Sequence, residues 1–193
     1  MTTGSVSPRR ADTRRNNERI LAAAAESLTG SEEISFNAIA KKAGVGVGTV
    51  YRHFPTQEAL VLAVYRREVE HLVDVVPVLL RTHTPELAFK EWTNHLARYM
   101  MTKRGLAKAL NAAATSPQEL FAKTNKAMLS AITTLLEANI EAGTVRPDLD
   151  PETVMRGLAG LMYLDPKTDW QAQTVALTKL LWDGMCRCPS PGC

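Results

Sequence analysis

The chain has 193 residues, 45% of them hydrophobic and 22% charged, and a formal net charge of +3. This length and hydrophobic content are ample for a packed core in one or two domains. No stretch of 18 apolar residues occurs, which excludes a membrane-spanning helix, and the amino terminus, MTTGSVSPRR, lacks the apolar core of a signal peptide. We therefore expect a globular, cytoplasmic protein.

The excess positive charge lies in the first part of the chain. Residues 1–55 hold 8 Lys and Arg against 5 Asp and Glu, whereas the remainder holds 15 of each kind. A local excess of positive charge is typical of a module that binds phosphates. We expect residues 1–12 to form a disordered basic arm. The arginines Arg9, Arg10, Arg14 and Arg15 then either reach a nucleic acid or form a solvated basic surface.

Residues 35–54, SFNAIAKKAGVGVGTVYRHF, follow a helix expected at about 13–28 and have the pattern of two short helices joined by a tight turn. Ser35 can cap the first helix, and Gly44 follows its last apolar residue, where helices usually end at positive φ. The second helix, Val47 to His53, ends before a proline. This is the helix-turn-helix plan, whose second helix lies in a DNA major groove. The predicted core residues of this stretch are Phe36, Ile39, Val50 and Phe54.

The stretch AGVGVGTVYRHFPTQEAL, preceded by RRNNERILAAAAESL, resembles the amino-terminal domain of the TetR family of bacterial transcriptional regulators. The resemblance is carried by Ala43-Gly44-Val45, by the run GTVYRHF and by Glu58-Ala59-Leu60, and it is close over about residues 13–65. Beyond that, only an all-helical layout agrees. The resemblance implies a dimeric repressor that leaves its operator when a small effector binds.

The resemblance also implies DNA contacts in a domain that we place at residues 13–55. Thr49, Tyr51 and His53 match positions that hold the sugar-phosphate backbone, and Asn37 matches a base-facing position where asparagine suits adenine. The predicted DNA-binding residues are Arg14, Arg15, Ser35, Asn37, Gly46, Val47, Gly48, Thr49, Tyr51, Arg52, His53 and Gln57.

The second helix of this motif departs from the family pattern. Relatives commonly carry a serine at the place of Gly46, a longer polar residue at that of Val47, and a lysine at that of Gln57. Gly46 and Gly48 cost about 1 kcal/mol each relative to alanine, and we expect them to permit close approach of the backbone to DNA. Val47 can offer only a methyl contact to a thymine.

Residues 56–187 are expected to form a second, helical domain. A long helix begins near Thr56, and Pro77 is expected to kink or end it. Pairs of a capping residue and a proline open later helices at residues 84, 116 and 150. We expect these helices at about 85–102, 104–113, 117–142, 151–164 and 168–186. No strand pattern occurs, so the predicted fold is all-α.

Apolar residues with a few polar ones line one side of the helices that begin at residues 85 and 117. Such stripes are ordinary core in most proteins. The family resemblance favours a pocket for a small, largely apolar effector, with Tyr99 and Asn125 as polar contacts. The predicted effector-binding residues are Trp92, Leu96, Tyr99, Met100, Phe121, Asn125 and Met128.

The last two helices carry more apolar surface than one small domain can bury. We expect them to pair with a second copy as a four-helix bundle about a two-fold axis, which requires an inverted-repeat operator. The predicted interface residues are Val154, Leu158, Leu161, Met162, Leu177, Leu181, Trp182 and Met185.

Enzyme activity has little support, because the chain shows no nucleophile elbow or phosphate loop. His71 and Asp74 could begin a metal site, but a solvated surface pair is the better interpretation, and we expect no cofactor. The three cysteines lie at the end of the chain, where residues 188–193 are expected to be a disordered tail. An alternative function is a ligand-independent DNA-binding or architectural protein, which a filled core in residues 85–142 would indicate.

Overall fold

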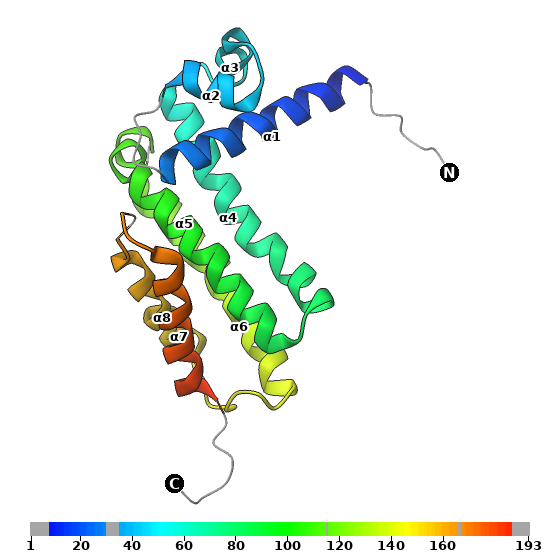
Figure 1. Cartoon of the computed structure of the whole chain (residues 1–193), viewed down its shortest axis with the longest axis vertical. Coiled ribbons are helices and arrows are strands. Elements are labelled where there is room, and N and C mark those ends of the chain that lie inside the picture. The colour runs from blue at the N-terminus through cyan, green and yellow to red at the C-terminus, as the bar shows by residue number, and fades with distance from the viewer. Residues whose placement is uncertain (1–7, 30–34, 115, 166, 187–193) are drawn as a thin grey trace, which may run out of the picture. The chain divides into compact units, whose positions relative to one another are not determined.

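The computed structural model describes residues 8–29, 35–114, 116–165 and 167–186. Throughout these ranges all regular structure is helical (Figure 1), apart from one isolated β-bridge between Val145 and Cys186. The prediction of an all-α fold is confirmed. The chain divides into two compact units, one of residues 1–67 and 105–115, the other of residues 68–104 and 116–193. This division falls inside two long helices, whereas the sequence placed the boundary at residue 55.

The first unit contains the helix-turn-helix. Its elements are α1 (Pro8–Thr29), α2 (Phe36–Ala43), α3 (Val47–His53), the first part of α4 (Gln57–Thr82) and the last part of α5 (Pro85–Ala113). Ile20 and Ala24 of α1 are fully buried, as is Val64 of α4. The four residues predicted as core in the motif are all buried, which confirms their structural role: Phe36, Ile39, Val50 and Phe54.

The second unit is a bundle of longer helices. Its elements are the remainder of α4 and α5, then α6 (Pro117–Glu141), α7 (Pro151–Leu158), the 3₁₀ helix η1 (Ala159–Tyr163) and α8 (Trp170–Met185). Trp92 is fully buried, and its Nε1–H donates to the carbonyl of Leu72 at 2.8 Å. Phe89 packs against Trp182, with 5.4 Å between ring centroids. None of the described helices is long and apolar enough to cross a membrane.

The predicted capping residues begin the helices of the second unit. Ser116 Oγ accepts a hydrogen bond from the N–H of Glu119, and the carboxylate of Asp150 accepts from the N–H groups of Glu152 and Thr153. Each of these helices has proline at its first position, where the missing N–H is not needed. The predicted starts at residues 117 and 151 are therefore confirmed.

Three helix boundaries differ from prediction. Helix α5 is continuous over residues 85–113, because its internal Gly105 costs only about 1 kcal/mol and buried residues such as Met101 and Leu106 lie on both sides of it. Helix α4 continues five residues beyond Pro77, which is exposed, so water can hydrate the carbonyl that the missing N–H leaves free. Helix α1 begins at Pro8, so residues 8–12 of the predicted arm are helical. Residues 1–7 and 188–193 lie outside the described ranges.

The helix predicted at 151–164 changes its winding midway. It is α-helical to Leu158 and then tightens into η1. A Cβ added to Gly157 would meet Cδ2 of Leu181 at 3.1 Å, and one added to Gly160 would meet Cδ2 of Leu177 at 3.3 Å. The two glycines therefore let the leucines of α8 pack closely against this segment.

Candidate functional site

The turn between α2 and α3 is fixed by caps. Ser35 Oγ accepts a hydrogen bond from the backbone N–H three residues on, at 3.4 Å. Gly44 ends α2 with φ of +64°, and the N–H of Val45 donates to the carbonyl of Ala40 at 3.0 Å. A side chain on Gly44 would also meet Nη2 of Arg19 at 2.5 Å. Glycine at this position therefore sets the direction in which α3 leaves α2.

The start of α3 exposes its backbone. Val47 is 38% exposed and Tyr51 is 55% exposed. A Cβ added to Gly46 or Gly48 would meet no atom within 4 Å. Gly46 also supplies no side-chain cap for the helix. Within the described chain, no neighbouring side chain requires glycine at either position.

The remaining predicted contacts on α3 are ordered by neighbours. Arg52 donates from Nη2 to Oγ1 of Thr49 at 3.1 Å and from Nε to the carbonyl of Gly48 at 3.2 Å. Thr49 and His53 are half-buried, and Arg52 is exposed. The guanidinium of Arg52 is thereby held along its own helix, with its outer face open to solvent.

A polar hollow of about 330 Å³ lies where α2 and α4 begin. Four of the predicted DNA-binding residues, distant in sequence by up to 22 positions, line it together: Ser35, Asn37, Tyr51 and Gln57. The ring of Tyr51 packs on that of Phe36, with 4.8 Å between centroids. Helix N-termini present unpaired N–H groups and a partial positive charge, which favour an anion such as a phosphate.

One of these two helix starts carries an acidic side chain. The pKa of Glu58, which is exposed in the first turn of α4, is lowered by a hydrogen bond from its own backbone N–H and by the hydroxyl of Thr56. Thr56 Oγ1 also accepts from the N–H of Ala59 at 3.1 Å. The carboxylate partly occupies the start of α4, so a phosphate in the hollow is favoured mainly by α2 and Tyr51.

The predicted arm arginines lie on α1 beside acidic residues. Arg14 Nε is 3.6 Å from a carboxylate oxygen of Glu18, and Arg15 Nη2 is 2.6 Å from Asp12. All four side chains are largely exposed, and exposed pairs of this kind contribute about 0–1 kcal/mol. Both arginines can therefore exchange these partners for a phosphate at little cost. Arg9 and Arg10 lie in α1, but their side chains fall outside the described part of the chain.

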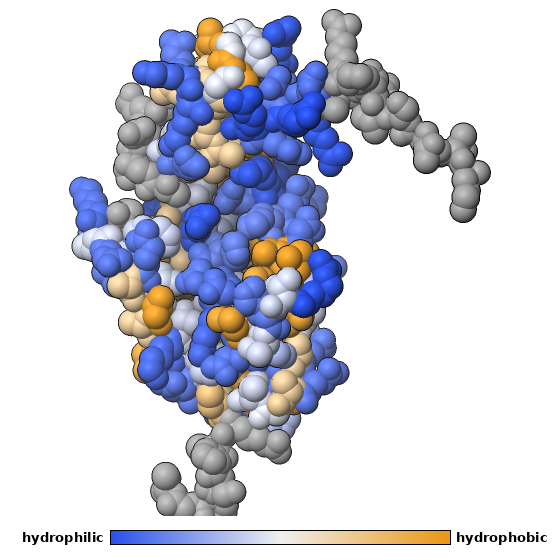
Figure 2. Space-filling model, turned by 45° about the vertical axis from the view of Figure 1, so that its right-hand side comes forward, coloured by the Kyte–Doolittle hydropathy of each residue, from blue (hydrophilic) through white to orange (hydrophobic). Residues whose placement is uncertain are grey.

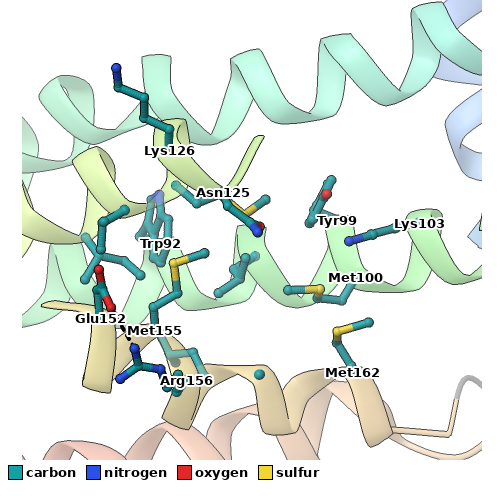
Figure 3. A pocket seen from close by; sticks show the side chains of 16 residues that line it. Trp92, Tyr99, Met100, Lys103, Asn125, Lys126, Glu152, Met155, Arg156 and Met162 are labelled. Atoms are coloured by element: carbon teal, nitrogen blue, oxygen red, sulfur yellow. Dashed lines mark hydrogen bonds and ion pairs between the residues drawn. The ribbon is translucent and has the colours of Figure 1, made fainter. Parts of the chain in front are cut away.

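The second unit contains a mainly apolar cavity of about 450 Å³ between α5, α6 and the segment formed by α7 and η1 (Figure 3). Six of the seven predicted effector-binding residues line it: Trp92, Leu96, Tyr99, Met100, Asn125 and Met128. Phe121 is not among its lining residues. Its ring lies beside the cavity, 4.8 Å from Nζ of Lys103.

Several lining residues were not predicted. Lys103 follows Tyr99 by four positions and Met100 by three, so helical spacing alone could have placed it on the same face. Met155 and Arg156 come from α7, and only the tertiary packing of α7 against α6 brings them to the cavity. Glu152 and Arg156 form an ion pair at 2.6 Å at the exposed side of the wall.

Comparison with known families matches both parts of the chain. Residues 20–64 match the family described as bacterial regulatory proteins, tetR family. Residues 84–187, more than half of the chain, match the SbtR-like transcriptional regulator C-terminal domain. The chain belongs to the TetR family. It is therefore a DNA-binding transcriptional regulator. A comparison with curated proteins found no match.

Solved structures of TetR-family regulators resemble this one along nearly their whole length. A TetR transcriptional regulator from Streptomyces coelicolor is 37% identical, covering 89% of this chain and 99% of its own, with a TM-score of 0.81. A TetR transcription regulatory protein from Mycobacterium vanbaalenii is 31% identical over 93% and 100% of the two chains, with a TM-score of 0.74. FadR from Bacillus subtilis, solved in complex with stearoyl-CoA, is 18% identical over 87% and 98%, with a TM-score of 0.54, and shows the fold alone.

The predicted dimer residues of this TetR-family regulator fall into two groups. Five of the eight are buried within the chain itself: Val154, Leu158, Leu161, Trp182 and Met185. Met162 is exposed, and Leu177 and Leu181 are half-buried against Gly160 and Gly157. Val175, whose apolar side chain on α8 also supported the dimer prediction, is exposed. The same elements carry two more exposed apolar side chains that were not predicted: Tyr163 and Leu180.

The histidine considered as a metal ligand has a partner on the next helix. His71 Nε2 lies 3.0 Å from Nδ1 of His95, on α5. In the described ranges, no group of three or more His, Cys, Asp or Glu side chains is arranged to hold a metal ion. Cys186 is a free, half-buried thiol, and Cys188 and Cys193 lie outside the described residues.

Proposed function

We propose that this TetR-family regulator is a dimeric repressor that leaves an inverted-repeat operator when a small molecule occupies the cavity of the second unit. The cavity of about 450 Å³ is the observation that carries the proposal. A domain that served only for dimerisation would gain nothing from a mainly apolar pocket of this size, because apolar surface left open to water is unfavourable. The cavity therefore favours an effector-controlled repressor over a ligand-independent DNA-binding protein.

The surface of α3 and the hollow beside it would contact the operator. Val47 and Asn37 are exposed and would face base edges, where a methyl group suits thymine and an amide suits adenine. Tyr51 and the start of α2 would hold a phosphate in the hollow lined by Ser35 and Gln57. Because α3 has only seven residues, one copy reads few bases, so a second copy is needed for useful specificity.

The exposed apolar residues on η1 and α8 support a dimer. Tyr163 is 89% exposed, Leu180 70% and Met162 48%. The face of the protein seen in Figure 2 is mainly hydrophilic and carries only separate, small apolar patches, so large exposed apolar side chains are the exception. Such residues are costly to leave in water and would be covered by a second copy across a two-fold axis.

The dimer can be tested at Leu180. Leu180→Glu should shift the protein from dimer to monomer in light scattering at micromolar concentration, because burying a carboxylate in an apolar interface is strongly unfavourable. Val78→Glu is the matched control, since Val78 is an exposed apolar residue on α4. Monomeric wild-type protein under the same conditions would defeat the proposed dimer.

Release from DNA requires an effector that prefers the DNA-free conformation, since equal affinity for both conformations shifts nothing. A hundred-fold loss of operator affinity corresponds to about 2.7 kcal/mol of coupling, within the usual range for allosteric proteins. The fully buried Trp92 in the cavity wall provides an optical report of entry.

The experiment combines these steps. DNA that the protein selects from a random pool should contain an inverted repeat, with half-sites separated by about one helical turn or a multiple. Compounds are then screened for quenching of tryptophan fluorescence and for loss of operator binding by fluorescence anisotropy. Trp92→Phe should remove the quenching and retain release. If no compound that quenches Trp92 changes operator affinity, the ligand-independent alternative is favoured.

A further inference from the structure

One lysine in the wall of the cavity has no acidic partner among the residues that the structure describes. Figure 3 shows the side chain of Lys103 pointing into the cavity, toward the side where the amide of Asn125 lies. Its ammonium is half-buried and stands 4.8 Å from the ring centroid of Phe121 and 6.0 Å from that of Tyr99. Among the described residues no carboxylate forms an ion pair with it, and burial lowers the pKa of Lys103 below its ordinary value.

The other charged residues of the cavity wall do not compensate this ammonium. Glu152 is paired with Arg156 at 2.6 Å, so their charges cancel locally. Lys126 is exposed, and Figure 3 shows its amino group directed away from the cavity. Three of the four charged residues in the wall are thus basic, and Lys103 is the one of these four that points inward without a counter-charge.

This arrangement is unfavourable for an empty or purely apolar cavity. A half-buried ammonium loses part of its hydration, and the cation–π attraction of the two aromatic rings contributes only about 0.5–2 kcal/mol in return. A methionine or leucine at position 103 would fill the same wall without that cost. A ligand with a negative group would restore the lost interaction, because charge-assisted hydrogen bonds are strongest where water is excluded.

We propose that the effector is an amphipathic anion, an apolar body with one carboxylate or similarly charged head group that pairs with Nζ of Lys103. The amide of Asn125 would donate a second hydrogen bond to the head group, and the apolar body would contact Trp92, Leu96 and Met155. This inference rests on the proposed function, because it names the class of molecule that the effector cavity takes.

The test uses two fluorescent probes that differ by one sulfonate: 1-anilinonaphthalene-8-sulfonate, an anion, and N-phenyl-1-naphthylamine, its neutral analogue. Wild-type protein, Lys103→Met and the matched control Lys126→Met are titrated with each probe. Lys103→Met should bind the anionic probe at least tenfold more weakly, since a hydrogen bond to a charged group contributes roughly ten- to hundred-fold in affinity. Its affinity for the neutral probe should stay within about threefold, as should both affinities of Lys126→Met.

A second measurement needs no variant, in case Lys103→Met fails to fold by circular dichroism. Decanoate should displace the neutral probe from wild-type protein at a concentration at least tenfold lower than decanol does. The inference is overturned if Lys103→Met binds the anionic probe like wild type, if decanol competes as well as decanoate, or if wild-type protein binds neither probe.

The outcomes also separate this inference from the proposed function. If only neutral compounds release the operator and Lys103 plays no role, the proposal of an effector-controlled repressor stands and the proposal that the effector is an anion is overturned. Binding of the anionic probe through Lys103, with no compound able to alter operator affinity, would support the anion site and defeat effector control.

Discussion

Two pairs of glycines, one in each unit, have opposite surroundings. Gly46 and Gly48, at the start of α3, have no atom within 4 Å of an added Cβ. Gly157 and Gly160 in the second unit would place a Cβ 3.1 and 3.3 Å from the leucine side chains of α8. The second pair is explained by packing inside the chain.

The first pair has no such explanation. Gly48 lies in the first turn of α3, where glycine costs about 0.5–1 kcal/mol relative to alanine, whereas Gly46 is the N-cap, a position that suits glycine better than alanine. Nothing around α3 compensates the cost of Gly48 within the described chain. We propose that a partner that approaches the backbone of α3 closely compensates this cost. Operator DNA is the partner that the family supplies, so the comparison predicts that the two units respond differently to the same kind of substitution.

The largest effect is expected at Tyr51, on the exposed side of α3. Tyr51→Ala should weaken binding to all DNA sequences about equally, by roughly 1.5–3 kcal/mol, because phosphate contacts carry no base information. Asn37→Ala should instead relax the preference at one base pair, by roughly 1–3 kcal/mol of discrimination. Tyr51→Phe, which keeps the ring on Phe36, separates the hydroxyl from the packing. If both alanine variants bind DNA like wild type in a mobility-shift assay, the proposed placement of α2 and α3 on DNA is wrong.

The packed glycines are tested by Gly157→Val. The added methyl groups would collide with Leu181 and force α7 and α8 apart, which should lower the free energy of unfolding by about 1–3 kcal/mol. Gly184→Ala is the control, because a Cβ on Gly184 of α8 meets nothing within 4 Å and should stabilise the helix slightly. Thermal denaturation measures both. If Gly157→Val and wild type have equal melting temperatures, Leu181 on α8 can move away from the added side chain without loss of stability.

Local hydrogen-bonding signals made one part of the molecule predictable from the sequence. The caps at Ser35, Ser116 and Asp150 and the positive φ at Gly44 depend on residues within four positions of each other, so their patterns identify the helix ends directly. The helix-turn-helix was recognisable from the same local signals, whereas the hollow that brings Ser35, Asn37, Tyr51 and Gln57 together depends on how α2, α3 and α4 pack, and their contact with DNA stays a prediction.

Features that depend on which helix faces meet were not predictable in this way. The cavity includes Met155 and Arg156 because α7 packs against α6, and no local pattern specifies that meeting. The apolar residues of α7 and α8 show the same limit, since a hydrophobic stripe does not reveal whether its partner is the same chain or another copy. Leu161 is fully buried in its own chain, whereas Leu180 is exposed.

The open glycines are tested by Gly48→Ala. The helix should gain about 0.5–1 kcal/mol in stability, since alanine is the best helix former and space is available. Operator affinity should fall despite this gain, because the methyl group would separate the backbone of α3 from DNA. A variant that is more stable and binds the operator as tightly as wild type would remove the functional explanation for this glycine.

The smallest effect concerns His95, in the second unit. The pKa of His95 is lowered by burial, then by the neighbouring His71 and Arg98, with Glu91 opposing. In the unfolded chain a histidine has a pKa of about 6.5. Between about pH 6.5 and the lower pKa of His95 in the folded protein, the unfolded chain therefore binds more protons than the folded chain. The free energy of unfolding should decrease as the pH drops through this window. Below the window, His95 should cause no further decrease.

His95→Gln should consequently show a shallower loss of melting temperature between about pH 7.5 and 5 than wild type. His83→Gln, at an exposed histidine beside Thr82, is the control and should keep the wild-type slope. The capping carboxylate of Asp150 also has a lowered pKa, because Thr153 donates to it, but its contribution is lost only below about pH 4, outside the tested range. Because His95 belongs to the second unit, operator affinity measured where the protein stays folded should be unchanged by His95→Gln. An unchanged slope in His95→Gln would mean that the folded protein protonates this histidine as readily as the unfolded chain does.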